Sequence, residues 1–277
     1  MSILPYIKDI ACYNQGELVQ YAYLASRYHM QLKDCLREDS ALDERAETAL
    51  CNLESYLNDR FEKICHRNFQ YIEGFFEEEN RAIPRVCLKA TYEDSIVCLF
   101  RSTSVEYNLS YPSTSNSGFQ FIQKTGQYFF CNNIPEAAQL GYYRNPRLNL
   151  DKVSNYKPNL FANLLFKNTN FDTKWVECWD AAGDGIDPQD CYKSTLIVPL
   201  TLWNNTLSDE FVGAIQQEKG RKIYGYLCLD YTEVNFFGAA DVFFLYIMAD
   251  LLSLFVITRR NYTVDSNTYR KVRKSIF

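Results

Sequence analysis

The stretch between Cys131 and Lys193 combines aromatic rings with cations. Its side chains of these two kinds include Tyr142, Tyr143, Arg144, Tyr156, Lys157, Trp175 and Trp179. Aromatic faces stack on flat ligands, and guanidinium or ammonium groups pair with anions. The stretch therefore predicts a pocket for an anionic ring ligand such as a nucleotide. Ordinary packing, as an aromatic lid with solvated charges, is the alternative for each residue.

Four aspartates lie close together in the same stretch, beside two glycines. They are Asp180, Asp184, Asp187 and Asp190. Carboxylate oxygens bind Ca²⁺, but the spacing does not match an EF-hand loop, whose ligands alternate and end on a glutamate. Turn formation and helix capping are the favoured roles, so no metal site is assigned.

The cysteine pattern indicates reduced thiols. The chain has ten cysteines without a CxxC pair and only two histidines, so no zinc site follows from ligand spacing. The N-terminus has no basic segment followed by an apolar one, and no secretory signal is expected. We predict a cytoplasmic protein whose cysteines are mostly small buried residues.

Charge and motifs exclude several function classes. The formal net charge is −5 although residues 259–274 hold six cations, so the rest of the chain is more acidic still. Nucleic acid is therefore not an expected partner, because phosphate contacts need clustered lysines and arginines. Residues 263–277 are expected to be a basic C-terminal tail. No nucleophile elbow, phosphate loop, HExxH or dinucleotide motif occurs, and no catalytic residue is assigned.

Helical periodicity dominates residues 1–80. Apolar residues recur every three or four positions from Leu18 to Cys35 and again from Leu50 to Phe75. The second helix is expected to extend to about Glu79, which is long for one small domain. We therefore predict a helical hairpin or coiled-coil extension that forms a homodimer.

Alternating apolar patterns begin after Pro84 and predict an antiparallel sheet. The expected strands are residues 85–90, 95–101, 127–131, 194–203 and 222–230. The last two are expected to be neighbours. Residues 107–118 predict an exposed loop, and residues 119–126 a short helix. The fold class is α+β, with helices flanking the sheet.

Residues 242–258 are almost entirely apolar, which raises the question of a membrane anchor. Their length is at the lower end of the roughly 17 to 25 residues that a span needs. Asp250 near the centre would cost about 2.5 to 3.5 kcal/mol in lipid. Tyr246, Asp250 and Ser253 lie at helical spacing on one side, so a buried amphipathic helix is preferred to the anchor.

Three sequence patterns resemble the GAF family. They are KSTLIVPL at residues 193–200, IYGYLCLD at 223–230 and FGAAD at 237–241, followed by an apolar helix. The phrase KTGQYFF at 124–130 is similar to the segment that leads into the third strand of that family. The resemblance implies a GAF-like sensor domain over residues 81–262. Such domains bind cyclic nucleotides, tetrapyrroles or other small molecules between sheet and helices, and commonly dimerise through terminal helices.

The resemblance and the aromatic stretch together suggest the ligand contacts. The expected residues are Phe129, Cys131, Tyr142, Tyr143, Arg144, Trp175, Trp179, Lys193 and Ser194. Cyclic-nucleotide-binding members carry an Asn-Lys pair ahead of a Phe and an Asp spaced like Phe237 and Asp241, whereas this chain has Leu229 and Asp230 there. Cyclic nucleotides are therefore one candidate among several, and no cofactor is assigned. Phe237 and Asp241 are expected to begin and cap a helix.

The predicted function is regulatory: a small-molecule sensor that passes ligand occupancy to a protein effector. A ligand-free interaction scaffold is the alternative. A third hypothesis follows from the family, because its free methionine sulfoxide reductases use thiols for attack and resolution. Cys131, Cys178 and Cys191 are the candidate thiols, although no motif of that enzyme surrounds them.

Overall fold

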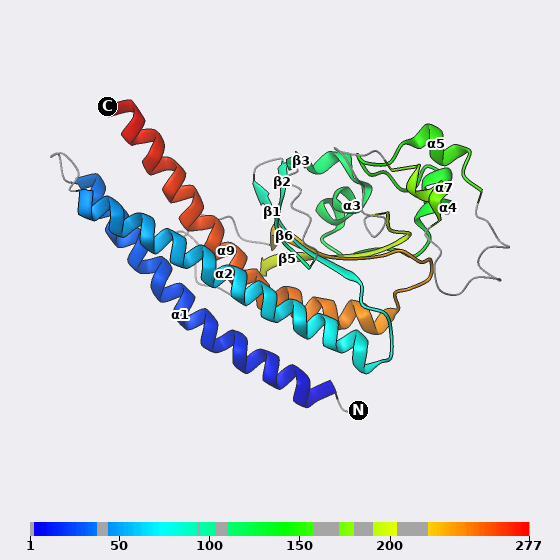
Figure 1. The fold of residues 1–277 in the computed structure, drawn as a ribbon, viewed down its shortest axis with the longest axis horizontal. Helices are drawn as coiled ribbons and strands as arrows, with labels where there is room; N and C mark the ends of the chain where they lie inside the picture. The colour runs from blue at the N-terminus through cyan, green and yellow to red at the C-terminus, as the bar shows by residue number, and fades with distance from the viewer. Residues whose placement is uncertain are drawn as a thin grey trace. The chain divides into compact units, whose positions relative to one another are not determined.

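A computed structural model describes residues 3–37, 44–92, 95–102, 110–157, 172–179, 191–203 and 221–276 (Figure 1). The chain divides into two units. The helical unit comprises Met1–Ile83, Leu200–Tyr224 and Ile247–Phe277, and the sheet unit comprises Pro84–Pro199 and Gly225–Tyr246.

Three long helices account for most of the helical unit. They are α1 (Ile3–Arg37), α2 (Glu44–Glu78) and the part of α9 (Ala239–Ile276) that begins at Ile247. Tyr21 of α1 lies 6.3 Å from the ring of Phe61 on α2 and 5.9 Å from that of Phe255 on α9. The apolar stripes predicted for the first two helices therefore bury one another within this chain, together with α9.

A pair of buried amides joins α1 to α2. Asn14 and Asn68 each donate to the side-chain oxygen of the other at 2.9 Å. Each amide also donates to the carbonyl oxygen one turn earlier, on Ile10 and Ile64 respectively. Buried polar groups that satisfy only one another favour a single register between two helices.

The outer side of α1 carries exposed apolar residues. Val19, Tyr23 and Met30 are 68%, 63% and 62% exposed, and their spacing of four and seven places them on one face. The apolar face of the second helix was expected to meet a neighbouring helix or a second subunit, and Phe61 of that face contacts Tyr21 of α1 within this chain. The predicted homodimer thus has α1 as its more apolar free surface among the described helices.

Helix α9 is long and apolar enough to span a membrane by length and composition alone. Of its window Ala239–Val264, 61% is buried inside the protein, as expected for a core helix. Two positions depart from the predicted amphipathic pattern, because the polar Ser253 is buried and the apolar Leu254 is 40% exposed. The hydroxyl of Ser253 donates to the carbonyl of Ala249 at 2.7 Å, which satisfies it inside the core. The helix continues to Ile276, so residues 263–276 of the predicted tail are helical.

The sheet unit is built on a six-stranded sheet of order β3-β2-β1-β6-β5-β4. The strands are β1 (Arg85–Tyr92), β2 (Ser95–Arg101), β3 (Ser110–Pro112), β4 (Phe129–Cys131), β5 (Ser194–Trp203) and β6 (Arg221–Tyr231). The pairs β1–β2, β1–β6, β2–β3 and β4–β5 are antiparallel. This confirms the predicted α+β class. The predicted loop was wrong at Ser110–Pro112, which pairs with the start of β2.

Short helices accompany the sheet. They are α3 (Ser117–Thr125), α4 (Ile134–Gln139), α5 (Leu150–Ser154) and α7 (Thr173–Val176). A 3-10 turn at Ser113–Ser115 precedes α3. Each α-helix starts at an Asn or Asp whose side chain accepts a backbone N–H: Asn116, Asn133, Asn149 and Asp172. These caps fix where the chain turns into each helix. Asp241 likewise accepts from Gly238 at 2.8 Å at the start of α9, which confirms its predicted capping role.

The two faces of the central strands differ in chemistry. One face is apolar, because Val86, Leu88, Leu227 and Leu229 are fully buried. The other, called here the polar face, carries Arg85, Cys87 and Lys89 of β1 opposite Asp230, Cys228 and Tyr226 of β6. Helix α3 packs on this face, where the ring of Phe119 lies 4.5 Å from that of Tyr226. A Cβ at Gly118 would come within 2.9 Å of side-chain atoms of Ile197 and Phe129, so a larger residue here would have to displace them.

Candidate functional site

Five of the predicted ligand contacts belong to one aromatic cluster. Phe129, Cys131, Tyr143, Trp175 and Trp179 pack together with further buried residues from α4, α5 and the segment just before β5. Tyr143, Trp175 and Trp179 are at most 2% exposed. The rings of Trp175 and Trp179 meet edge to face at 6.0 Å, and the Trp175 indole donates to the Tyr192 carbonyl at 3.3 Å. The predicted aromatic stretch is therefore a packed cluster in its described part.

The other predicted contacts lie elsewhere. Tyr142 is 77% exposed and Arg144 is exposed as well. Lys193 pairs with Asp172 at 3.0 Å, and the Ser194 hydroxyl donates to the Glu233 carbonyl at 2.7 Å. These four side chains are not members of the aromatic cluster. The four aspartates weighed as cation ligands lie at positions 180–190, outside the described residues, and the described residues contain no group of His, Cys, Asp and Glu suited to a metal.

The three cysteines considered for sulfoxide reduction are poorly suited to form thiolates. Burial raises the pKa of the Cys131 thiol and of the Cys178 thiol above their ordinary value. Cys191 is 2% exposed within the aromatic cluster. A buried apolar setting favours the neutral thiol, which is the unreactive form.

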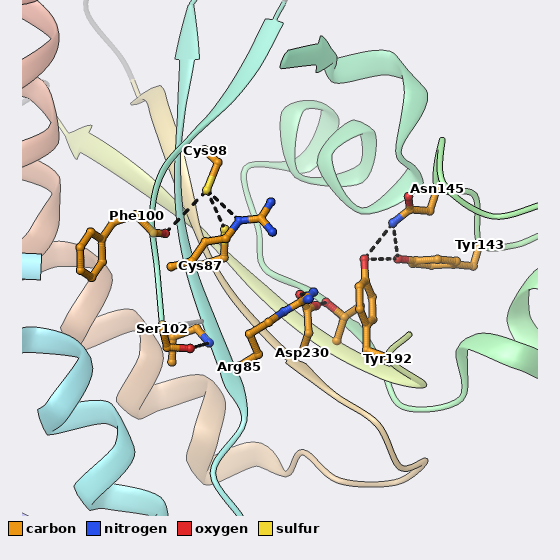
Figure 2. A network of polar contacts seen from close by, with 12 residues as sticks. Arg85, Cys87, Cys98, Phe100, Ser102, Tyr143, Asn145, Tyr192 and Asp230 are labelled. Atoms are coloured by element: carbon orange, nitrogen blue, oxygen red, sulfur yellow. Dashed lines mark hydrogen bonds and ion pairs between the residues drawn. The ribbon is translucent and has the colours of Figure 1, made fainter. Parts of the chain in front are cut away.

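A chain of polar contacts begins at the edge of the aromatic cluster, as Figure 2 shows. The Asn145 amide donates to the Tyr192 hydroxyl at 2.8 Å, and the hydroxyls of Tyr143 and Tyr192 lie 3.3 Å apart. The Arg85 guanidinium lies 5.3 Å from the centre of the Tyr192 ring. The cluster thus adjoins the polar face through Tyr192.

Arg85 and Asp230 form the centre of the polar face. Their side chains are 2.9 Å apart and each is 9% exposed. The Thr195 hydroxyl donates to the other carboxylate oxygen of Asp230 at 2.7 Å. Burial opposes the charge of Arg85, but the neighbouring Asp230 outweighs it and raises the pKa of Arg85, so the guanidinium keeps its charge. Leu229 and Asp230 occupy the positions of the Asn-Lys pair of cyclic-nucleotide-binding GAF domains. Leu229 points to the apolar face and is fully buried.

Cys87 and Cys98 lie beside this ion pair in Figure 2, and Arg101 contacts Cys98. The sulfur atoms of Cys87 and Cys98 are 3.4 Å apart, and Arg101 Nε donates to Cys98 Sγ at 3.1 Å. The Phe100 carbonyl oxygen is 3.8 Å from the same sulfur. The hydrogen bond from Cys87 and the neighbouring Arg101 charge outweigh burial and lower the pKa of Cys98 to about 5. The pKa of Cys87 is raised well above its ordinary value by the same hydrogen bond and by burial.

Regular strand geometry would separate Cys98 from Arg101, and this is why the group was not predicted. Residues three apart in a regular strand face opposite sides. Here Leu88 pairs with Phe100 and Lys89 with Cys98, so Leu99 is an extra residue in β2. This β-bulge brings Arg101 onto the side of Cys87 and Cys98. The only signal in the sequence was a cysteine in each strand of the predicted hairpin, joined to an arginine.

Comparisons with known proteins give no match at the sequence level. No family model matches the chain, and no curated protein does.

Comparison with solved structures finds similar folds at low identity. Type II free methionine-R-sulfoxide reductase from Thermoplasma acidophilum is 10% identical, with TM-score 0.41 over 72% of this chain and 94% of that chain. A far-red cyanobacteriochrome photoreceptor is 10% identical, with TM-score 0.39 over 77% and 96%. The GAF domain of a two-component sensor histidine kinase from Bacillus halodurans is 12% identical, with TM-score 0.33 over 69% and 95%.

The structural neighbours thus include GAF sensor domains as well as free methionine-R-sulfoxide reductases. At these identities and TM-scores no residue role is transferred from them to this chain.

Proposed function

We propose that the protein is a cytoplasmic regulatory sensor of the GAF type, which binds a small anionic molecule on the polar face of its sheet. The single observation that supports this proposal is the concentration of charge on that face. Arg85, Lys89 and Arg101 lie there with Asp230, on three neighbouring strands of a sheet whose opposite face is apolar.

Energetics favour a functional reason for this charge. Removing ions from water costs several kcal/mol each, and replacing a buried ion pair by apolar residues is often neutral or stabilising. Buried ion pairs in an otherwise apolar interior are found most often at functional sites. Arg85 and Asp230 are such a pair.

The expected ligand carries a carboxylate or a phosphate. Arg101 and Lys89 are half-buried, and the positive charge of each lowers the pKa of the Cys98 thiol. The two charges therefore lie close together, around Cys98 on the polar face. A guanidinium binds carboxylate or phosphate with strong charge-assisted hydrogen bonds. Nucleotides remain candidates among other anionic metabolites. Asp230 already bonds to Arg85 and Thr195, so it does not replace the Asn-Lys pair of cyclic-nucleotide-binding domains.

The proposed output runs through the helices. A homodimer would bury the exposed stripe of Val19, Tyr23 and Met30 on α1. The stability of this dimer would depend on whether the ligand is bound. A protein effector is the proposed receiver of that change.

Thermal stabilisation by ligands tests the proposal. A ligand that binds only the folded state, present at about one hundred times its Kd, stabilises by about 2.7 kcal/mol. The panel should hold cyclic and linear nucleotides, amino acids, dicarboxylates and methionine sulfoxide. We expect at least one anionic compound to raise the Tm in a dose-dependent way. An unchanged Tm across the panel would favour the scaffold.

The scaffold alternative has one observation in its favour. The aromatic cluster predicted to roof a pocket is filled by its own side chains in the described residues. The reductase alternative is weakened by the raised pKa of Cys131 and Cys178. Turnover of free methionine sulfoxide that disappears in Cys131→Ser or Cys191→Ser would support it, and no turnover by the unmodified chain would end it.

A further inference from the structure

The cysteines of β1 and β2 form a pair that is poised for a covalent bond. Cys87 Sγ and Cys98 Sγ are 3.4 Å apart, whereas a disulfide needs about 2.05 Å. A shift of little more than an ångström therefore separates the two thiols from a bond. Cys87 is 3% exposed and Cys98 is partly exposed, so a small reagent reaches Cys98 first.

The surroundings of the pair distinguish the two sulfurs. The Cys87 hydrogen bond and the Arg101 guanidinium stabilise negative charge on Cys98, and Lys89 adds to this effect. On the β6 side, Cys228 is fully buried and neutral, because burial raises its pKa to about 12. Within the pair, negative charge is therefore favoured on Cys98 over Cys87.

This arrangement meets the requirements of a redox-sensitive cysteine: thiolate character, access, and a resolving thiol in contact. We propose that Cys98 and Cys87 are an oxidation site, at which a hydroperoxide converts Cys98 to a sulfenic acid and Cys87 then closes a disulfide between β1 and β2. This modification needs no bound ligand, although it shares Arg101 and Lys89 with the anion site proposed above.

The chemistry balances in two steps. The Cys98 thiolate attacks one peroxide oxygen, the S–O bond forms as the O–O bond breaks, and the leaving oxygen takes a proton and departs as water or an alcohol. The Cys87 sulfur then attacks the Cys98 sulfur, the S–S bond forms, and the hydroxyl leaves as water with the Cys87 proton. Two thiols lose two electrons and the peroxide gains them.

Oxidation changes the charge of the polar face. The disulfide removes the anion that faces Arg101 and Lys89, and leaves both cations on that part of the sheet. The oxidised face is therefore more positive than the reduced face.

Tryptic mapping tests the proposal without any ligand. Cleavage after Arg85, Lys89 and Arg101 places Cys87 on residues 86–89 and Cys98 on residues 90–101. The reduced full chain is treated at pH 7 with less than one equivalent of hydrogen peroxide, blocked with N-ethylmaleimide and digested. We expect the linked pair of these two peptides as the main oxidised product. Its absence, or equal oxidation of the exposed Cys12 and Cys51, would overturn the proposal.

Variants identify the roles of the two sulfurs. Cys87→Ser should accumulate a sulfenic acid on Cys98 that dimedone traps, while Cys98→Ser should leave Cys87 reduced. Cys131→Ser is the matched control and should retain the linked peptides. Dimedone labelling of Cys131 as fast as Cys98 in the Cys87→Ser protein would contradict the assignment.

The pH dependence of alkylation separates a reactive site from a merely close pair. Iodoacetamide should modify Cys98 with a midpoint near pH 5, reported by the mass of residues 90–101. Arg101→Gln should raise this midpoint by about 1 to 3 pH units, because it removes the adjacent positive charge. A midpoint near 9 in both proteins would overturn the proposal.

Discussion

The Arg85 guanidinium on β1 and the Asp230 carboxylate on β6 lie 2.9 Å apart, with 9% of each side chain exposed. Thr195 on β5 donates to the second carboxylate oxygen, so the interaction connects three strands. A buried ion pair contributes little net stability, but each partner depends on the other. Loss of one charge of this pair should therefore lower the stability of the protein strongly, whereas loss of both charges should lower it much less.

Asp230→Asn is expected to destabilise the protein by about 3 to 5 kcal/mol, because it leaves a buried guanidinium without its carboxylate. Urea unfolding measures the change. The double variant Arg85→Met with Asp230→Leu should be more stable than either single variant. Lys63→Gln, which breaks an exposed pair with Asp59, is the control and should cost at most about 0.5 kcal/mol. Additive effects of the two buried substitutions would contradict this account.

The amide pair between α1 and α2 should behave in a similar way. Asn14→Ala or Asn68→Ala is expected to cost about 1 to 3 kcal/mol, since each leaves the other buried amide without a partner. Replacing both by leucine should cost less than the sum of the single changes. A double-mutant cycle by urea denaturation tests this. A coupling energy of zero would mean that the two amides do not depend on each other.

Asp172 should make the stability of the sheet unit depend on acid pH. Burial opposes its ionisation, but hydrogen bonds from Tyr156 and Lys193 outweigh burial and hold the pKa of Asp172 below its ordinary value. A lowered folded-state pKa contributes stability above the unfolded-state pKa and loses it as pH falls through the folded-state pKa. We therefore expect the Tm to decline as the pH drops below about 5.

The variant Asp172→Asn isolates that contribution. It retains an oxygen that can cap α7, and it should lower the Tm at pH 7 while flattening the decline at acid pH. The exposed Asp151→Asn is the matched control and should leave the decline unchanged. An equally steep acid decline in Asp172→Asn would show that other carboxylates cause it.

The exposed stripe on α1 predicts how a homodimer forms. Tyr23→Glu places a charge at the centre of the stripe of Val19, Tyr23 and Met30 and should convert the dimer to a monomer at micromolar concentration. Light scattering after size exclusion reports the mass. Leu140→Glu changes a residue of the sheet unit that is similarly exposed, at 61%, and should leave the mass unchanged. A native chain that is monomeric at all concentrations would refute this part of the proposal.

Much of the sheet could be predicted because its strands bury one face or both. Residues 194–203 were predicted as a strand and form β5 with the same ends, since their alternating and β-branched residues suit no helix. The entry into α9 was legible from Asp241 because capping is a local interaction. The short helices α4, α5 and α7 were missed, because elements of one or two turns give too little periodicity.

The polar face could not be predicted from local patterns. Its composition depends on which strands become neighbours, and Arg85 and Asp230 are far apart in sequence. The bulge at Leu99 reverses the side on which Arg101 lies, and alternation from the hairpin turn alone would have placed the guanidinium on the apolar face. Aromatic rings were visible in the sequence, but nothing local distinguished the packed Trp175 from the exposed Tyr142.

Binding of an anionic ligand to wild type and to Arg101→Gln tests the central proposal most directly. Calorimetric titration with the compound that stabilises most is performed on both proteins and on Lys124→Gln, whose exposed lysine lies on α3. A charge-assisted hydrogen bond contributes about 1.5 to 3 kcal/mol, so Arg101→Gln should weaken the affinity roughly tenfold or more. Lys124→Gln should bind as wild type does. The proposal is contradicted if Arg101→Gln binds the compound with unchanged Kd, or if no anionic compound binds the wild type.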